Sequence, residues 1–408
     1  MLFQLTLYKY VICLIIILLI IRENRLKSKI QIPANIKFFY LLVFFYFFLS
    51  LPDFIEYGWG GFLLWKQFMW LPIFVIIFTR THYLTSFSQH QVVLLFVRVM
   101  FLYCFLNCLF YFIELPIWKN YHVYMGRITV GYPTVDVVIT IFALLVVLFH
   151  PHLQFKYLEK TVYIVTFVLS ILSQASGTGI FLLVFCFVTV GIYLLRTRKI
   201  KTTSLILAIA IISFSAANIL SYMRNNNSAL YDNIMLQIEN RVYVMIGKGH
   251  QAEMNVNTLD IRQEEYIKAE KKHSGEIGVV FGHGFGKVTG NIKEITSNIF
   301  LIEDQYHIIK FAMGWLGVLL FYSILVTLFF RIFFSRIELS YKYLYCSVIV
   351  CLVSSTFTAF SMGTIGICGS LAIIISDSPG IFKKSHIVFG KLQKCSEASE
   401  KMEFFMRC

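Results

Sequence analysis

The sequence predicts an all-α polytopic integral membrane protein with about 11 transmembrane helices and one large extracytoplasmic loop. Two observations lead to this prediction. Of the 408 residues, 58% are hydrophobic and only 14% are charged, which is too little charge to cover the surface of a soluble protein of this length. Apolar runs of about 20 residues, long enough to cross a bilayer core of roughly 30 Å, recur along the chain.

The apolar runs define the spans in order. The first lacks both a basic region before it and a small-residue cleavage site after it, so we expect a retained helix rather than a signal peptide. We expect spans near residues 7–21, 37–51, 62–78, 91–115, 133–150, 161–175, 178–195, 202–220, 308–330, 343–360 and 362–377. The resulting parts are transmembrane helices 1–8 in 1–220, the extracytoplasmic loop in 221–305, helices 9–11 in 306–380 and a cytoplasmic tail in 381–408.

Basic residues gather in the connections between alternate spans, namely at 22–29, 196–201 and 331–342, and in the tail from Lys383. This distribution follows the positive-inside rule, and it predicts an N-terminus outside and a C-terminus in the cytoplasm. The net charge of +14 therefore needs no nucleic-acid partner. The nine cysteines form no disulfide framework and no CxxC metal pair, and we expect no metal site.

The long polar segment, from about Ser221 to Asp304, carries half of the acidic residues. Within it, residues 278–287 read GVVFGHGFGK, with glycines spaced as closely as in a phosphate-binding loop. We exclude nucleotide binding because no strand–turn–helix context surrounds the glycines, no GKS or GKT follows, and the segment is predicted to lie outside the cell. The glycines instead predict a tight turn and a close approach of the backbone to a ligand or to the membrane face.

The stretch EDQYHIIKFAMGWLGVLLF follows at 303–321 and enters the ninth span. An aspartate such as Asp304 at this point either caps the helix or takes part in catalysis, and the sequence leaves both roles open. Gly314 and Gly317 are predicted to share one helix face, where small residues allow close helix–helix approach. Lys310 is expected to extend its side chain outward to the membrane surface.

In this order, the motifs resemble those of the O-antigen polymerase and O-antigen ligase superfamily, which includes capsule and exopolysaccharide repeat-unit polymerases. The resemblance covers the general layout and residues 260–321, where TLDIRQEEY with Arg262 is followed by FGHGFG and then by EDQYHIIKFAMGWLGVLLF. Two features depart from the family. Ser176 in the short outer turn is followed by Gly177 instead of an arginine, and Asp304–Gln305 replace the histidine–asparagine pair of ligases. The second departure favours a polymerase.

The resemblance implies a metal-independent membrane glycosyltransferase without a cofactor. Its substrates would be undecaprenyl-pyrophosphate-linked oligosaccharide repeat units, joined into O-antigen, capsular polysaccharide or exopolysaccharide at the outer face of the bacterial inner membrane. Membrane lipid, a chain-length regulator and a flippase of the same pathway are the other implied partners. The alternatives are an O-antigen ligase and a flippase or exporter of lipid-linked oligosaccharides. The scarcity of charges within the spans and the lack of an internal repeat argue against a transporter.

The proposed chemistry needs two kinds of side chain. A guanidinium holds a leaving pyrophosphate through paired hydrogen bonds, and a carboxylate or histidine accepts the proton of the acceptor hydroxyl. With the resemblance, these needs imply catalytic roles for Arg262 and Asp304. The implied substrate-binding residues are Arg241, Arg127, His283, Glu303, His307, Gly284 and Gly286.

Overall fold

The computed structural model of the protein describes residues 34–57, 65, 68–75, 89–113, 133–174, 177–198, 218, 221–222, 224–225, 263, 266–271, 276–287, 304–357 and 365–376. The regular elements of these segments are α-helices, as the sequence predicts. They are α2 (Ala34–Leu49), α3 (Leu51–Tyr57), α6 (Gln89–Ile113), α7 (Pro133–Phe149), α8 (Tyr157–Ser173), α9 (Gly177–Arg196), α13 (Glu276–Phe281), α14 (Gln305–Phe334), α15 (Leu339–Thr356) and α16 (Ile365–Ser376).

Four of these helices, α6, α9, α14 and α15, are long and apolar enough to cross a membrane. Helices α2, α7 and α16 are shorter apolar helices. Each of the seven, and α8 with them, lies where a span was predicted, and its ends fall within a few residues of the predicted ones. The predicted span at 7–21, and nearly all of the one at 202–220, lie outside the described residues.

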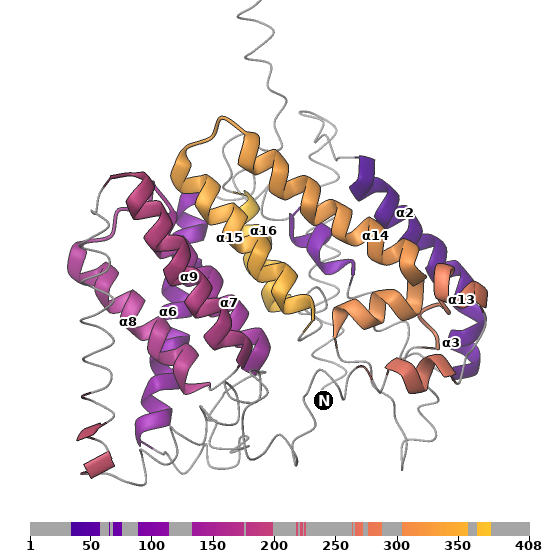
Figure 1. The fold of residues 1–408 in the computed structure, drawn as a ribbon, viewed down its shortest axis with the longest axis horizontal. Coiled ribbons are helices and arrows are strands. Elements are labelled where there is room, and N and C mark those ends of the chain that lie inside the picture. The colour runs from indigo at the N-terminus through magenta and orange to yellow at the C-terminus, as the bar shows by residue number, and fades with distance from the viewer. Residues whose placement is uncertain are drawn as a thin grey trace, which may run out of the picture.

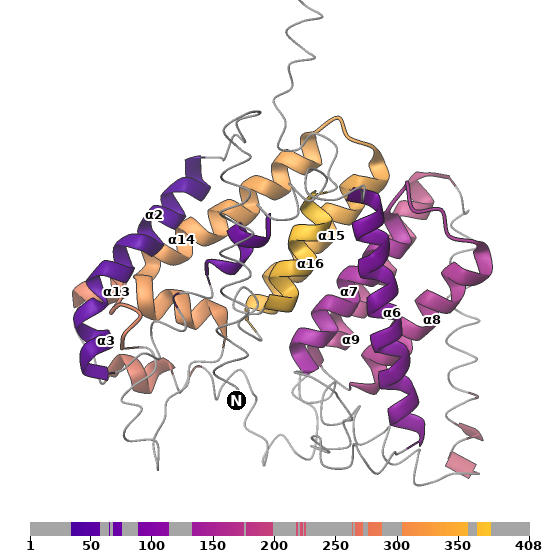
Figure 2. The same ribbon diagram turned by 180° about the vertical axis from the view of Figure 1, so that it is seen from behind.

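Helix α7 is the central element of one half of the molecule. It is apolar on all sides, and the side chains from Ile141 to Val147 are at most 2% exposed, as expected of a helix surrounded by others. It packs against α6, α8, α9, α15 and α16. In Figures 1 and 2, α6–α9 form one side of the bundle, α2, α3, α13 and α14 form the other, and α15 and α16 lie between them.

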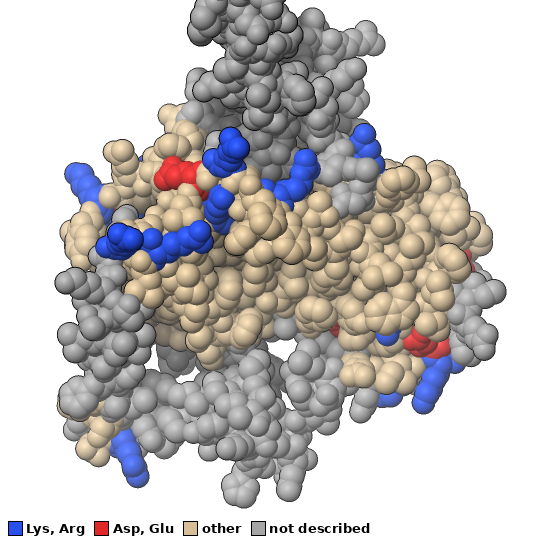
Figure 3. All heavy atoms as spheres, turned by 45° about the horizontal axis from the view of Figure 1, so that its top comes forward, with Lys and Arg blue, Asp and Glu red and all other residues tan. Residues whose placement is uncertain are grey.

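Basic side chains gather at one end of the bundle. They come from the start of α8, the end of α9 and the connection from α14 to α15, and include Lys156, Lys160, Arg196, Arg198, Arg331, Arg336 and Lys342. Figure 3, which brings the upper end of Figure 1 forward, shows the blue side chains along this end. The last turns of α6 and α8 and the first turns of α7 and α14 lie at the opposite end (Figures 1 and 2).

Candidate functional site

Helix α14 is interrupted at Gly314, whose φ of 64° and ψ of −165° are not helical. This backbone conformation is essentially restricted to glycine. The prediction that Gly314 and Gly317 share the face of one continuous helix is therefore wrong. A Cβ on Gly317 would lie 3.3 Å from the Ile309 side chain and closer still to Met313, so this glycine lets the two parts of α14 pack together.

The two parts of α14 differ in length and direction. The part after the break, 315–334, has about 20 residues and a length of about 30 Å, enough to cross a bilayer. The part before it, 305–313, is a short helix that runs at an angle to the longer part (Figure 1). Residues on the short part are therefore held at the end of the bundle that lies opposite the basic side chains.

The glycine segment 282–286 pairs with the interruption of α14. The backbone N–H of His283 donates to the carbonyl of Phe311 (2.8 Å), and that of Gly284 donates to the carbonyl of Ala312 (3.0 Å). An interrupted helix leaves carbonyls without intrahelical partners, and these two bonds supply partners for them. Gly282 has a φ of 81°, and a Cβ there would lie 2.5 Å from the nitrogen of Gly314. The two glycine motifs of the sequence thus form one structural unit.

The other side of the glycine segment contacts the junction of α2 and α3. The N–H of Phe285 donates to the hydroxyl of Ser50 (2.8 Å), and a Cβ on Gly284 would lie 2.8 Å from the same oxygen. A Cβ on Gly286 would overlap the side chain of Asp53. The tight turn predicted for this segment is confirmed, with a φ of 84° at Gly284. Substrate contacts of Gly284 and Gly286 stay a prediction.

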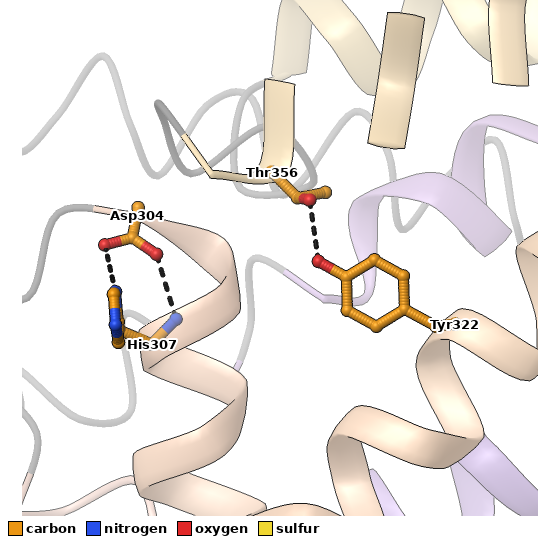
Figure 4. Close-up of polar contacts among 4 residues, drawn as sticks. All are labelled: Asp304, His307, Tyr322 and Thr356. Carbon is orange, nitrogen blue, oxygen red and sulfur yellow. Dashed lines mark hydrogen bonds and ion pairs between the residues drawn. The ribbon is translucent and has the colours of Figure 1, made fainter. Parts of the chain in front are cut away.

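Asp304 and His307 form a carboxylate–histidine pair at the start of α14 (Figure 4). Oδ1 of Asp304 accepts the backbone N–H of His307 (2.9 Å), which makes Asp304 the N-cap of the helix. Its Oδ2 lies 2.7 Å from Nδ1 of the His307 ring. An ionised carboxylate only accepts hydrogen bonds, so Nδ1 is the donor of this pair, and in the neutral imidazole Nε2 is the nitrogen that bears the lone pair.

The two members of the pair differ in their access to a substrate. The side chain of Asp304 is 1% exposed, and both of its oxygens are engaged by His307, whose side chain is 17% exposed. Of the two roles that the sequence leaves open for Asp304, the structure shows the cap. A substrate at this site would meet the imidazole of His307, with Asp304 holding the ring behind it.

Aromatic rings and one ammonium group surround His307. The ring centroids of Tyr266 and Tyr306 each lie 5.0 Å from that of the imidazole. The Nζ of Lys310 lies 4.4 Å from the centroid of Tyr266 and 5.0 Å from that of Trp315, in cation–π range of both rings. Burial, with a hydrogen bond and the charge of Glu270, raises the pKa of the Tyr266 phenol, so this ring is neutral. The ammonium of Lys310 is therefore held by two rings, one of which, Tyr266, also contacts the histidine.

A second group of rings joins α14 to the end of α15. The centroid of Tyr306 lies 5.2 Å from that of Phe357, and Phe357 stacks on Tyr322 at 6.0 Å. The single hydroxyl proton of Thr356 is donated to the carbonyl of Val353 (2.6 Å). The Thr356 oxygen therefore accepts the hydrogen bond from the O–H of Tyr322 (2.8 Å), which Figure 4 shows. These contacts fix the position of Tyr306, which borders the histidine.

His283 has a different environment from His307. Its ring lies 4.9 Å from that of Phe311, and a Cβ on Gly278 would lie 2.7 Å from its Nδ1. Burial lowers the pKa of His283, while the charge of Glu270 opposes and that of Lys287 reinforces this effect. The imidazole is therefore neutral at neutral pH and packs where α13 meets the break in α14. A substrate contact of His283 stays a prediction.

The remaining predicted site residues, Arg262, Arg241, Arg127 and Glu303, lie outside the described residues. Within the described segments, no group of three or more histidine, cysteine, aspartate or glutamate side chains is placed to hold a metal ion. No protein-family model matches the sequence, and no curated protein matches it significantly. The function is therefore argued from the geometry of the site.

Proposed function

We propose that this protein polymerises undecaprenyl-pyrophosphate-linked oligosaccharide repeat units into O-antigen, capsular polysaccharide or exopolysaccharide at the outer face of a bacterial inner membrane. The observation that carries the proposal is the Asp304–His307 pair at the start of α14, with the Tyr266 ring against the imidazole and the Lys310 ammonium on the Tyr266 ring. The proposal includes about 11 spans, an N-terminus outside and a C-terminus in the cytoplasm.

The distribution of charge supports the orientation. Seven of the described basic side chains gather at the end of the bundle opposite the Asp304–His307 pair, and fewer, Lys310 among them, lie on the pair's side (Figures 1 and 3). Under the positive-inside rule the basic end faces the cytoplasm, so the pair faces outward. Lipid-linked repeat units that have crossed the membrane would reach it there.

The pair fits the acid–base requirement of glycosyl transfer. In the proposed step, a hydroxyl oxygen of the incoming lipid-linked unit bonds to the anomeric carbon at the reducing end of the growing chain. The bond from that carbon to the pyrophosphate oxygen breaks, and the leaving lipid pyrophosphate keeps the electron pair. Nε2 of His307 accepts the hydroxyl proton, and Asp304 stabilises the imidazolium that forms. A positioned general base of this kind contributes about 10²- to 10⁴-fold in rate.

The neighbours of the pair fit the binding requirement. The ring of Tyr306, which is partly exposed, offers an aromatic surface for a sugar ring, and Lys310 supplies a positive charge for a pyrophosphate. Arg262, Arg241 and Arg127 keep their proposed roles as further phosphate or sugar contacts. The lipid pyrophosphate stores the energy of the transfer, so the proposed reaction needs no nucleotide.

The size distribution of the surface glycan in a strain that lacks the gene tests the proposal. A polymerase predicts single repeat units on the surface and no long chains, because transport and attachment still operate. A surface without any repeat units would overturn the polymerase and leave the ligase or the flippase. Accumulation of lipid-linked polymer would then identify the ligase.

A further inference from the structure

A cluster of polar side chains lies within the half of the bundle formed by α6–α9, on the other side of α15 and α16 from the pair on α14 (Figures 1 and 2). Polar groups inside membrane-spanning helices are destabilising unless they are paired, and they mark functional positions. The members of the cluster on α6, α7 and α8 are Tyr103, Cys104, Asn107, Asp136, Thr140, Ser170 and Gln174.

The charged member of the cluster has its partners within the protein. The O–H of Tyr103 donates to Oδ2 of Asp136 at 2.7 Å, an ordinary length for an O–H···O hydrogen bond. Asp136 also lies in the first turn of α7, where the helix dipole stabilises negative charge. The hydroxyl of Thr140 donates to the backbone carbonyl of Asp136 (2.7 Å) and lies 3.5 Å from Sγ of Cys104. These contacts join α6 to α7.

Two amide side chains of the cluster lack partners. Asn107 is fully buried, and neither Nδ2 nor Oδ1 has a hydrogen-bond partner among the described residues. It follows Tyr103 and Cys104 by one turn, so it shares the face of α6 that meets α7. Gln174 is also fully buried. Its Nε2 donates to the hydroxyl of Ser170 (3.5 Å), but its Oε1 has no partner in the same described part.

A contact between α6 and α8 places the α8 amide near the same cluster: Sγ of Cys108, the residue after Asn107, lies 3.8 Å from the carbonyl oxygen of Thr166, one turn before Ser170. Helices α6 and α8 also pack directly against each other. Buried polar atoms in native proteins almost always have a partner, and the bilayer interior offers none. The unpaired atoms of Asn107 and Gln174 therefore call for an occupant that brings hydrogen bonds.

The unpaired atoms specify the chemistry of that occupant. They comprise one donor, Nδ2 of Asn107, and two acceptors, its Oδ1 and Oε1 of Gln174. A bare cation would satisfy the oxygens and leave the donor unpaired. An anion would satisfy the donor alone and would lie in the same cluster as the Asp136 carboxylate. Hydroxyl groups both donate and accept, so they satisfy all three atoms.

We propose that α6, α7 and α8 form a binding site for saccharide hydroxyl groups. Tyr103 and Asp136 are partly exposed, whereas Asn107 and Gln174 are fully buried. The ends of α6, α7 and α8 next to the cluster lie at the same end of the bundle as the start of α14 (Figures 1 and 2). The choice of a saccharide rests on the proposed function, because water offers the same hydroxyl chemistry, and the experiment must separate the two.

Saturation-transfer NMR on the full-length protein tests the site. The probes are the methyl glycosides of a hexose, a 6-deoxyhexose and an N-acetylhexosamine, added to protein in lipid nanodiscs free of glycoside detergents. We expect saturation transfer to at least one probe, and a loss of affinity of tenfold or more in Asn107→Leu and Gln174→Met. Both variants should fold: Asn107→Leu removes two buried atoms without described partners, and Gln174→Met removes one such atom together with a long 3.5 Å bond to Ser170. A thermal midpoint no lower than that of the wild type checks this.

The controls separate the site from the proposed polymerase. His307→Ala alters the proposed catalytic site on α14, so saturation transfer that persists in this variant and is lost in the two amide variants reports on the α6–α8 site. If no glycoside binds to the wild type, or if the two amide variants bind as the wild type does, the cluster holds water only and the saccharide site is wrong. Glycoside binding does not depend on polymer synthesis. The glycan sizes therefore test the proposed polymerase, and the glycoside-binding measurement tests the saccharide site independently.

Discussion

Replacing Gly314 by alanine tests the unit formed by the glycine segment and the break in α14. The φ of 64° and ψ of −165° at this position are strained for any residue with a Cβ, at about 1–3 kcal/mol. The added Cβ would also overlap the carbonyl of Val280 and lie 2.6 Å from the nitrogen of Gly282. Overpacking of this kind adds about 1–3 kcal/mol. The lower entropy of the unfolded alanine chain returns about 0.4–1 kcal/mol, so the net destabilisation is about 1–5 kcal/mol.

Thermal denaturation of the purified protein in detergent, followed by tryptophan fluorescence, measures the effect. The matched control is Gly369→Ala in α16, where a Cβ meets no atom within 4 Å and alanine is the better helix former. We expect a midpoint several degrees lower for Gly314→Ala and an unchanged or higher midpoint for Gly369→Ala. Equal midpoints for the two variants would refute the interrupted helix and its pairing with the glycine segment.

The remaining predictions concern side chains of the two sites. Asp304→Asn should reduce polymer synthesis at least tenfold, because it replaces a charge that orients His307 and stabilises its imidazolium; unchanged turnover in membranes would leave Asp304 a cap alone. Lys310→Met should weaken binding of the lipid pyrophosphate substrate while Lys310→Arg retains most of it, which a Michaelis constant for the lipid-linked unit would show. The pKa of His283 is lower in the folded protein than in the unfolded chain. Below the ordinary histidine pKa near 6.5, the unfolded chain therefore binds a proton at His283 more readily than the folded protein does. The free energy of unfolding is highest above this pH and declines as the pH falls below it. Denaturation midpoints between pH 7.5 and 5 should show this decline in the wild type and a smaller one in His283→Gln. Tyr103→Phe should lower the midpoint by removing a hydrogen bond to a carboxylate, worth about 1.5–3 kcal/mol; a midpoint equal to that of the wild type would contradict the bond.

The helices could be predicted from the sequence because they are specified locally. The span expected at 133–150 is the helix Pro133–Phe149, and the one expected at 91–115 is the helix Gln89–Ile113. In both, a long apolar run is bounded by polar residues, and the need to satisfy every backbone group within a bilayer leaves the helix as the available structure. The cap was one of the two roles that the sequence left open for Asp304, because a cap depends only on residues within one turn.

The break in α14 could not be predicted, because it depends on contacts distant in sequence. Gly314 and Gly317 have the spacing of small residues on a continuous helix face. What stabilises the interruption is a pair of hydrogen bonds from His283 and Gly284, about 30 residues earlier in the chain. The proximity of FGHGFG to FAMGWLG is therefore a product of tertiary structure, and neither motif reveals it alone.

The polar residues of α6–α8 were missed for a related reason. Asn107 and Asp136 are single polar residues in long apolar runs, and only the packing of the helices shows that they share one cluster. Lys310 was expected to extend towards the membrane surface. Its position between Tyr266 and Trp315 depends on a ring from a separate segment. The sequence placed Asp304 and His307 among the candidate residues in separate roles, and their three-residue spacing, which puts both side chains on one helical turn, is the signal that could have paired them.

The most direct test of the central claim is the surface glycan of a gene-deleted strain that carries His307→Ala in place of the wild-type copy. The wild-type copy should restore long chains, and His307→Ala, present in the membrane at the same level, should leave single repeat units. Long chains of near-normal abundance from His307→Ala would contradict the assignment of this histidine as the base of a polymerase.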